Sequence, residues 1–230
     1  MVVQHNLTAM NANRQLSGVQ NAQQKSTEKL SSGYRINRAG DDAAGLSISE
    51  KMRSQIRGLN KAVSNAQDGI SLVQVAEGAL NETHSILQRM NELATQAAND
   101  TNTSTDRNAL QKEMDQLTSE IDRIRSTTQF NSMNLLDGSF TGKELQVGAL
   151  SGQKISISIG NMNSSKLKIS GLKVSSFSSA GKAMAAIQKA INSVSTQRSK
   201  LGALQNRLEH TINNLNTTSE NTSAAESRIR

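Results

Sequence analysis

The stretch KMRSQIRGLNKAVSNAQDGISLVQVAEGAL, residues 51–80, carries apolar side chains at alternating intervals of four and three residues. This spacing is typical of a coiled-coil seam, in which one face of a long helix packs against a neighbouring helix. The residues in this line are Met52, Ile56, Leu59, Val63, Ala66, Ile70, Val73 and Leu80. The pattern predicts one helix over about residues 44–99, which would be roughly 84 Å long at 1.5 Å per residue.

The second half of this helix has a different apolar line. Continuing the same seam beyond Leu80 would place the polar residues His84 and Asn91 on it. Apolar residues fall instead at Ile86, Met90, Leu93 and Ala97. We therefore expect the apolar stripe to step sideways around the helix after Leu80.

Two further segments show seam spacing. After the N-cap candidates in DTNTSTD, residues 104–129 carry Leu110, Met114, Leu117, Ile121 and Ile124. Residues 177–230 carry Met184, Ile187, Ile191, Val194, Leu201, Leu204, Leu208, Ile212 and Leu215. Two long helices of matching length and one short helix predict a mainly α fold, an elongated antiparallel bundle or coiled-coil rod.

A small β excursion is predicted between the last two helices, near residues 138–175. ELQVGALSGQKISISIG alternates Ile155, Ile157 and Ile159 with serines, and glycines lie near a turn. KLKISGLKVS continues the period of two. We expect a β-hairpin that extends into this second segment.

Residues 5–33 have a weaker helical pattern through Leu7, Met10, Leu16, Val19 and Leu30. A helix with so thin an apolar face is marginal alone in water and needs a partner. We therefore divide the chain into residues 1–43, an N-terminal helix with a connecting segment, and residues 44–230, the helical rod.

Composition and charge exclude several classes of protein. The 230 residues include no Pro, Cys or Trp and only 2% aromatic residues, which favours long unbroken helices and rules out disulfides and thiolate metal sites. The net charge of +7 belongs to the last third of the chain. Those charges are scattered and have no interleaved aromatic residues, so we expect neither a nucleic-acid partner nor, without an apolar run of about 18 residues, a membrane span.

LSSGYRINRAGDDAAGLSIS, residues 30–49, interrupts the helical sequence and could be a ligand-binding loop, a paired-carboxylate active site or a joint. Asp41 and Asp42 are adjacent, so on a helix their side chains diverge by about 100° and do not converge on one substrate. They suit a helix start, where their oxygens cap free N–H groups. We interpret the stretch as a joint in which Arg35 and Arg38 meet acidic groups.

No other motif indicates catalysis or a cofactor. DGSFTGKE resembles a phosphate-binding loop, but Asp137 stands where the first glycine is required and Glu144 where Ser or Thr would hold magnesium. His5, His84 and His210 are isolated and lack a second ligand at metal-binding spacing. We expect no enzyme activity, no cofactor and no metal.

Long runs of the sequence resemble bacterial flagellin. Its N-terminal conserved region is similar to residues 30–49, to KMRSQIRGLNKAVSNAQDGISLVQVAEGALNETHSILQRMNELATQAAND and to EIDRIRSTTQFNSMNLLDG. SKLGALQNRLEHTINNLNTTSENTSAAESRIR resembles the start of its C-terminal conserved region. The resemblance implies a filament subunit for motility, located in the extracellular flagellum and exported unfolded without a cleaved signal, with an export chaperone, a cap and other flagellin subunits as partners.

The resemblance also implies a truncation. Flagellins continue some 40 residues beyond the SRIR stretch into a C-terminal helix that pairs with the first helix, and their variable outer domains are absent here. We therefore expect a short, truncated form that stays monomeric, with residues 1 to about 40 frayed.

The family is also the ligand of a vertebrate Toll-like receptor, which reads the side of the helical rod. Carried over through LQRMNEL and the neighbouring helices, the resemblance assigns a receptor and subunit interface to Gln88, Arg89, Leu93, Glu113, Ile187 and Ile191. Leu93, Ile187 and Ile191 also lie on apolar stripes and can simply be core residues. The sequence thus favours a filament subunit, and a soluble receptor ligand or antigen is the alternative.

Overall fold

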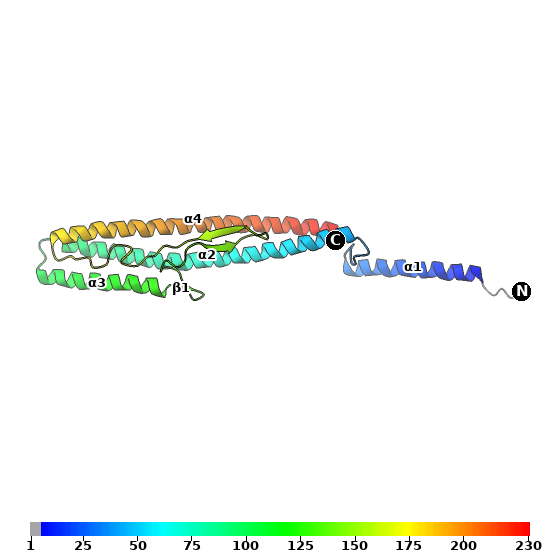
Figure 1. The fold of residues 1–230 in the computed structure, drawn as a ribbon, viewed down its shortest axis with the longest axis horizontal. Helices are drawn as coiled ribbons and strands as arrows, with labels where there is room; N and C mark the ends of the chain where they lie inside the picture. Colours follow the sequence, from blue (N-terminus) through cyan, green and yellow to red (C-terminus); the bar gives the residue numbers. More distant parts are fainter. Residues whose placement is uncertain (1–5) are drawn as a thin grey trace. The chain divides into compact units, whose positions relative to one another are not determined.

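The structure, a computed structural model, describes residues 6–230 and is mainly helical (Figure 1). Its elements, in chain order, are helices α1 (Leu7–Ser32), α2 (Ala43–Ala97) and α3 (Ser104–Thr127), strands β1 (Gln129–Phe130), β2 (Met133–Asn134), β3 (Lys143–Gln146) and β4 (Lys154–Ile157), and helix α4 (Phe177–Ile229). The predicted α fold and its three rod helices are therefore confirmed.

The chain forms two compact units. The central unit runs from Asn60 to Asn216, and the terminal unit comprises the described residues up to Leu59 together with Thr217–Arg230. The predicted domain boundary at residue 43 coincides with the start of α2, whereas the compact units divide inside that helix.

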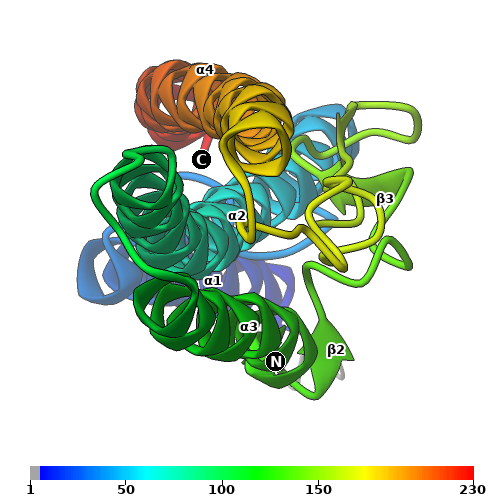
Figure 2. The ribbon, with the colours of Figure 1, turned by 90° about the vertical axis from the view of Figure 1, so that its left-hand side faces the viewer.

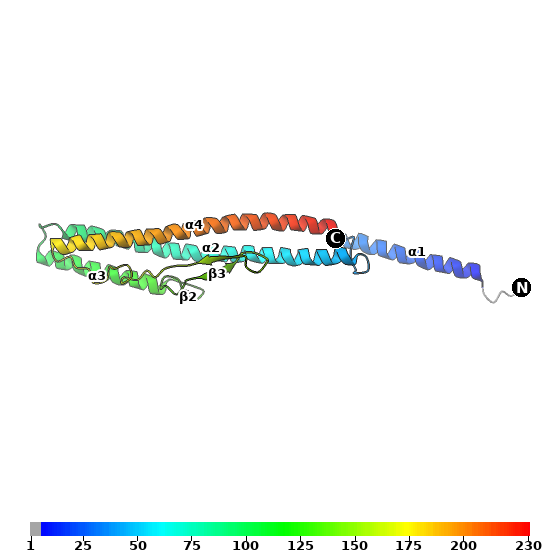
Figure 3. The same cartoon turned by 45° about the horizontal axis from the view of Figure 1, so that its top comes forward.

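In the central unit, α3 and α4 lie beside α2 and run antiparallel to it (Figures 1 and 3). Seen end-on, α2 lies between α4 and α3, with the β3 hairpin to one side (Figure 2). Side chains of all three helices share one hydrophobic core, which includes Leu87 of α2, Met114 of α3 and Ile187 of α4. The antiparallel packing follows from the short connection between α2 and α3 and from the apolar stripe on each helix.

The buried stripe of α2 does not step sideways, and that prediction was wrong. Within the central unit it alternates four and three residues without a break, through Ala62, Ala66, Gly69, Val73, Ala76, Leu80, Thr83, Leu87, Met90, Ala94 and Ala97. Several of these residues are small, so a search for large apolar side chains follows the flanking Val63, Ile70 and Ile86 instead. Thr83 is the polar residue of this stripe. It can be buried because its hydroxyl donates to the Ala79 carbonyl oxygen at 2.9 Å.

Helix α4 presents a matching stripe. Its buried residues are Ala180, Ala183, Ile187, Ala190, Val194, Gln197, Leu201, Leu208 and Leu215. Gln197 is the polar member, and its side-chain Nε2 donates to the Ser158 carbonyl oxygen at 3.3 Å. Small alanines in both stripes leave room for close helix approach, and the leucines and valines fill the space between.

The β structure is smaller than the sequence predicts in one place and larger in another. β3 and β4 pair antiparallel with Leu145 opposite Ile155, which confirms the hairpin. Residues 166–175 form turns rather than the expected strand. A second hairpin, β1 with β2, was not predicted; its turn places Asn131 and Ser132 at φ 47° and 61°, the left-handed conformation that tight hairpin turns require.

The β3–β4 hairpin rests on the two long helices of the central unit. Val147 and Ile155 form a second apolar cluster with Ala66 of α2 and Leu208 of α4. A Cβ atom at Gly69 would lie 2.3 Å from the Leu145 Cδ1 atom, so the glycine lets the hairpin approach α2 closely.

Helix α1 of the terminal unit is capped at both ends and buries none of its residues. The Asn6 side chain accepts from the Ala9 N–H at 3.1 Å, and Gly33 ends the helix at φ 72°. Leu7–Ser32 are helical throughout. Fraying of this segment in solution therefore stays a prediction, one that the lack of buried contacts supports.

Residues 33–42 form the predicted joint between α1 and α2. Asp42 caps α2 by accepting from the Gly45 N–H at 2.8 Å, and Asp41 accepts from the backbone N–H groups of Asn37 and Arg38 at 3.2 and 3.1 Å. These bonds, that of Arg38 first, hold the pKa of Asp41 below its ordinary value. The helix-start role is therefore confirmed for Asp42 and was wrong for Asp41, whose carboxylate holds the backbone of the joint instead.

The two arginines of the joint behave differently. Arg38 contacts Glu28 at 2.9 Å, as predicted. Arg35 meets no acidic group in that way: its guanidinium donates to the Ile229 carbonyl oxygen at 2.7 Å. It binds the C-terminal end of α4, where carbonyl oxygens lack helical donors and attract a positive charge.

Candidate interaction surface

On α2, Gln88 and Arg89 lie between two residues of the buried stripe and face outward. Leu87 and Met90 point into the core, so their neighbours Gln88 and Arg89 point outward. Glu113 is exposed on α3. We call these three residues, Gln88, Arg89 and Glu113, the Arg89 surface.

Arg89 joins two helices through its guanidinium group. Its Nε and Nη2 donate to the Glu113 Oε1 atom at 3.1 and 3.0 Å, and its Nη1 donates to the Glu92 Oε2 atom at 3.1 Å. The side chain is still 51% exposed. The two carboxylates therefore hold the guanidinium in one position while leaving much of it free for a partner.

The two carboxylates stabilise the charged form of Arg89. Hydrogen bonds from Glu113 first, and then from Glu92, raise the pKa of Arg89 above its ordinary value. One cation lies between two anions, so the cluster carries a net negative charge. Because all three groups are exposed, solvent screens their attraction, and their contribution is to orientation more than to stability.

Gln88 has a hydrogen-bond partner on its own helix. Its Nε2 atom lies 3.1 Å from the His84 Nε2 atom, one turn earlier, and the amide donates if that ring nitrogen is the unprotonated one. This contact orients the amide beside Arg89.

The other three predicted interface residues are placed differently. Leu93 and Ile187 are 1% and 0% exposed and belong to the shared core. Ile191 is partly buried and packs against that core. The structure thus brings Gln88, Arg89 and Glu113 together at the surface, and it makes Leu93 and Ile187 supports beneath it.

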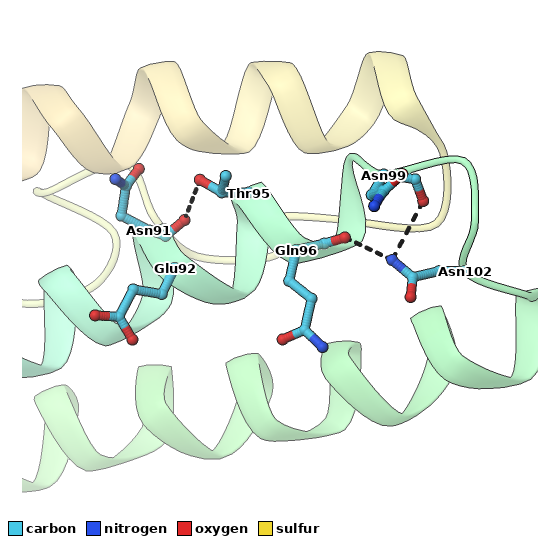
Figure 4. Close-up of a pocket in the computed structure, with 6 residues that line it drawn as sticks. All are labelled: Asn91, Glu92, Thr95, Gln96, Asn99 and Asn102. Atoms are coloured by element: carbon cyan, nitrogen blue, oxygen red, sulfur yellow. Dashed lines mark hydrogen bonds between the residues drawn. The ribbon is translucent and has the colours of Figure 1, made fainter.

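A polar pocket of about 590 Å³, which the sequence reasoning missed, lies close to this surface. It is lined by Asn91, Glu92, Thr95, Gln96, Asn99 and Asn102 (Figure 4). Glu92 belongs both to the pocket and to the Arg89 cluster, so the two features are continuous. The abundance of amide side chains between residues 91 and 102 was the available signal.

The helix end supplies the fixed part of this pocket. The Asn102 amide donates to the Gln96 carbonyl oxygen at 2.6 Å and to the Asn99 carbonyl oxygen at 3.2 Å. In Figure 4, Glu92 and Gln96 point toward α3, and Asn91 and Thr95 lie on the side of α4. The arrangement offers amide and carboxylate groups for hydrogen bonds with a polar partner.

Residues 6–230 contain no group of three or more His, Cys, Asp or Glu side chains that could hold a metal ion. His5, one of the three histidines considered in the sequence, lies outside the described residues. No helix of the described chain is both long enough and apolar enough to cross a membrane.

Comparison with known proteins finds two family models along the chain. The model of the bacterial flagellin N-terminal helical region matches residues 3–141, and that of the bacterial flagellin C-terminal helical region matches residues 184–230. The second match reaches Arg230 and gives no support to the expectation of a truncated chain.

Relatives and solved structures agree with these matches. The flagellin of Halalkalibacterium halodurans is 55% identical over 100% of this chain and 85% of its own length. The flagellin of Bacillus subtilis is 49% identical over 100% of this chain and 87% of its own length. The crystal structure of Bacillus cereus flagellin has 33% identity and a TM-score of 0.61, and it covers 71% of this chain and 94% of the other.

Proposed function

Because the chain belongs to the bacterial flagellins, we propose that the Arg89 surface is a contact surface of the filament subunit. Flagellin is the structural subunit of the extracellular flagellar filament and has no enzymatic role. Its work is polymerisation with other flagellin subunits. The proposal concerns which residues of this chain carry such contacts.

One observation carries the proposal: Arg89 is held by carboxylates of two helices and is still about half exposed. Arginine is favoured at protein interfaces because its planar guanidinium offers several donors in a fixed geometry. A group already held in position loses little conformational entropy on binding. Leu93 and Ile187 support this geometry from below, since they fix α2 and α4 in the shared core.

The same surface supports the second proposed role, that of a ligand for the vertebrate Toll-like receptor for flagellin. Gln88, Arg89 and the adjoining polar pocket form a continuous exposed region with hydrogen-bonding groups of both kinds. A receptor and a neighbouring subunit would then use the same residues. We therefore propose that only the monomer is available to the receptor.

The test is Arg89→Ala, with binding of the purified protein to the receptor ectodomain as the measurement. Loss of a central arginine should weaken binding about tenfold or more. The matched control is Arg123→Ala, because Arg123 donates to Glu120 at 2.8 and 2.6 Å, also on an exposed helix face but away from the proposed surface. Unchanged affinity for Arg89→Ala, with an unchanged helical signal, would remove Arg89 from the site.

The two roles are separated by a second measurement. Filaments from cells that produce Arg89→Ala subunits should be shorter or less stable than those with Arg123→Ala subunits. Pelleted wild-type filament should bind the receptor poorly compared with monomer. Filament that binds as well as monomer does would contradict a shared surface.

The remaining proposed partners are the flagellar export chaperone and cap, which the family resemblance suggests. We also propose that the isolated 230-residue chain is monomeric, because α1 buries no residue and so lacks a packing partner within the described chain. Light scattering after size exclusion should give one monomer mass at two concentrations. A mass that rises with concentration would overturn this expectation.

A further inference from the structure

A long segment of this protein carries positive charge without any acidic residue. Between Leu145 and Leu208 the basic residues are Lys154, Lys166, Lys168, Lys173, Lys182, Lys189, Arg198, Lys200 and Arg207. Neutralising carboxylates must therefore come from other elements or from a partner.

Four of these lysines surround one cavity of about 420 Å³ in the central unit. Lys166 and Lys168 lie in the connection between β4 and α4, and Lys182 and Lys189 lie on α4. We call this feature the lysine pocket. The other lining residues are Leu167, Ala185, Ala186 and Ser193, so the described lining contains no carboxylate.

The backbone of the connection fixes the first pair of lysines. The Asp122 carboxylate on α3 accepts from the Ser164 N–H at 2.9 Å and from its hydroxyl at 2.6 Å. Leu167 and Ile169 are buried, which turns Lys166 and Lys168 outward. Lys168 has φ 58°, a left-handed conformation that is unfavourable outside glycine, so the surrounding packing must impose it.

The helix fixes the second pair. Lys182 and Lys189 are seven residues apart, so they lie on one face of α4, two turns or about 10.5 Å from each other. A ligand with several anionic groups along its length can contact both ammonium groups without drawing the two lysine side chains together.

None of the four lysines forms an ion pair among the described residues, unlike two other cations of the segment. Lys154 contacts Glu144 at 2.6 Å and Arg198 contacts Glu77 at 3.7 Å. Four like charges around one cavity raise the local positive potential, which attracts an anionic ligand.

We propose that the lysine pocket binds a flexible linear polyanion that carries repeated phosphate groups. Lysine ammonium groups are point charges that tolerate varied phosphate geometry. The lining has no aromatic side chain on which a nucleic-acid base could stack.

The test uses end-labelled linear inorganic polyphosphate and fluorescence anisotropy with the 230-residue protein. The pocket variant is Lys166→Gln, Lys168→Gln, Lys182→Gln and Lys189→Gln combined. The control variant removes the same charge from four exposed lysines outside the pocket, Lys61, Lys112, Lys173 and Lys200, each also changed to Gln. Circular dichroism checks that both variants stay helical.

We expect the pocket variant to bind at least tenfold more weakly and the control variant to stay within about threefold of wild type. Four phosphate contacts to a single strand predict a slope of about −2.8 in log affinity against log salt for wild type, and a slope near zero for the pocket variant. If the combined variant loses helical signal, Lys189→Gln alone should reduce the slope by about 0.7.

Three results would overturn the proposal. They are no binding by wild type, equal losses in the two combined variants, and displacement of polyphosphate by orthophosphate at equal phosphate concentration, which would indicate a site for single small anions. Arg89→Ala should bind polyphosphate like wild type, so this experiment is independent of the Arg89 surface.

Discussion

Helices α1 and α3 have nearly the same length and similar caps, and they differ in what they bury. α1 has 26 residues and α3 has 24. Asn6 caps the first, and Thr103 with Asp106 forms a full capping box on the second. Local sequence thus gives each helix a defined start.

The difference lies in packing. Met114 and Ile121 of α3 are buried in the shared core, whereas α1 buries no residue and leaves Leu30 86% exposed. Isolated helices of this length are marginal in water, and most helix stability in proteins comes from a packed apolar face. The comparison therefore predicts that α3 is stabilised by tertiary contacts and that α1 depends on its caps alone.

The largest expected effect comes from Leu87→Ala, in the core that α2 shares with α3 and α4. Leu87 is fully buried, so the cavity should lower the free energy of unfolding by about 2–5 kcal/mol. The matched change in α1, Leu16→Ala, should stay within about 0.5 kcal/mol, because Leu16 is 56% exposed. Urea unfolding followed by circular dichroism measures both, and similar small losses would place Leu87 outside the core.

A smaller effect is expected from Thr103→Ala, which removes the capping box of α3. The loss should be about 0.5–2 kcal/mol in the unfolding of the central unit. Asn6→Ala removes the equivalent cap from α1 and should leave that unfolding transition in place, since α1 buries nothing. Hydrogen exchange of the first turns of both helices distinguishes local fraying from loss of tertiary structure; equal shifts of the transition would contradict the comparison.

The smallest effect is the dependence of that cap on pH. The Thr103 hydroxyl, and then its backbone N–H, hold the pKa of Asp106 below its ordinary value of 3.8. A carboxyl with a lowered folded pKa stabilises the fold above the unfolded value, and this contribution is lost as pH falls through the folded pKa. The stability difference between wild type and Asp106→Asn should therefore shrink below about pH 4; a difference that grows on acidification would refute the assignment.

Sequence reasoning located the helices and missed the continuous core line of α2. Periodicity finds large apolar residues readily, and Met90 and Leu93 were identified in this way. Ala76, Thr83 and Ala94 are buried because two neighbouring helices approach them, a fact that side-chain hydrophobicity does not report. Leu87 lies on the same unbroken line and was missed because the predicted stripe followed the neighbouring Ile86 instead.

The β segments show the same limit. Residues 166–175 alternate like a strand, but alternation cannot show whether a pairing partner is within reach, and here the backbone turns. Residues 129–134 pair across a tight turn with two left-handed residues, for which the sequence contains no glycine signal.

The candidate surface was half predictable. Arg89 and Gln88 were assigned through the family resemblance, and their places beside the apolar stripe agree with exposure because the helix period puts them on the outside. The pairing of Arg89 with Glu113 joins residues 24 apart in sequence and on different helices. Only the packing of α3 against α2 brings these charges together.

By itself, the sequence determined where the long helices lie, that one of them starts near Asp41 or Asp42, that the short helix starts after DTNTSTD, and which family the chain resembles, because caps, heptads and long motifs are local in sequence. The tertiary structure decided that Leu93 and Ile187 are core while Arg89 stays at the surface, and that four lysines face one cavity. Those outcomes depend on distances between elements remote in sequence, which helix–helix packing sets and local propensity does not.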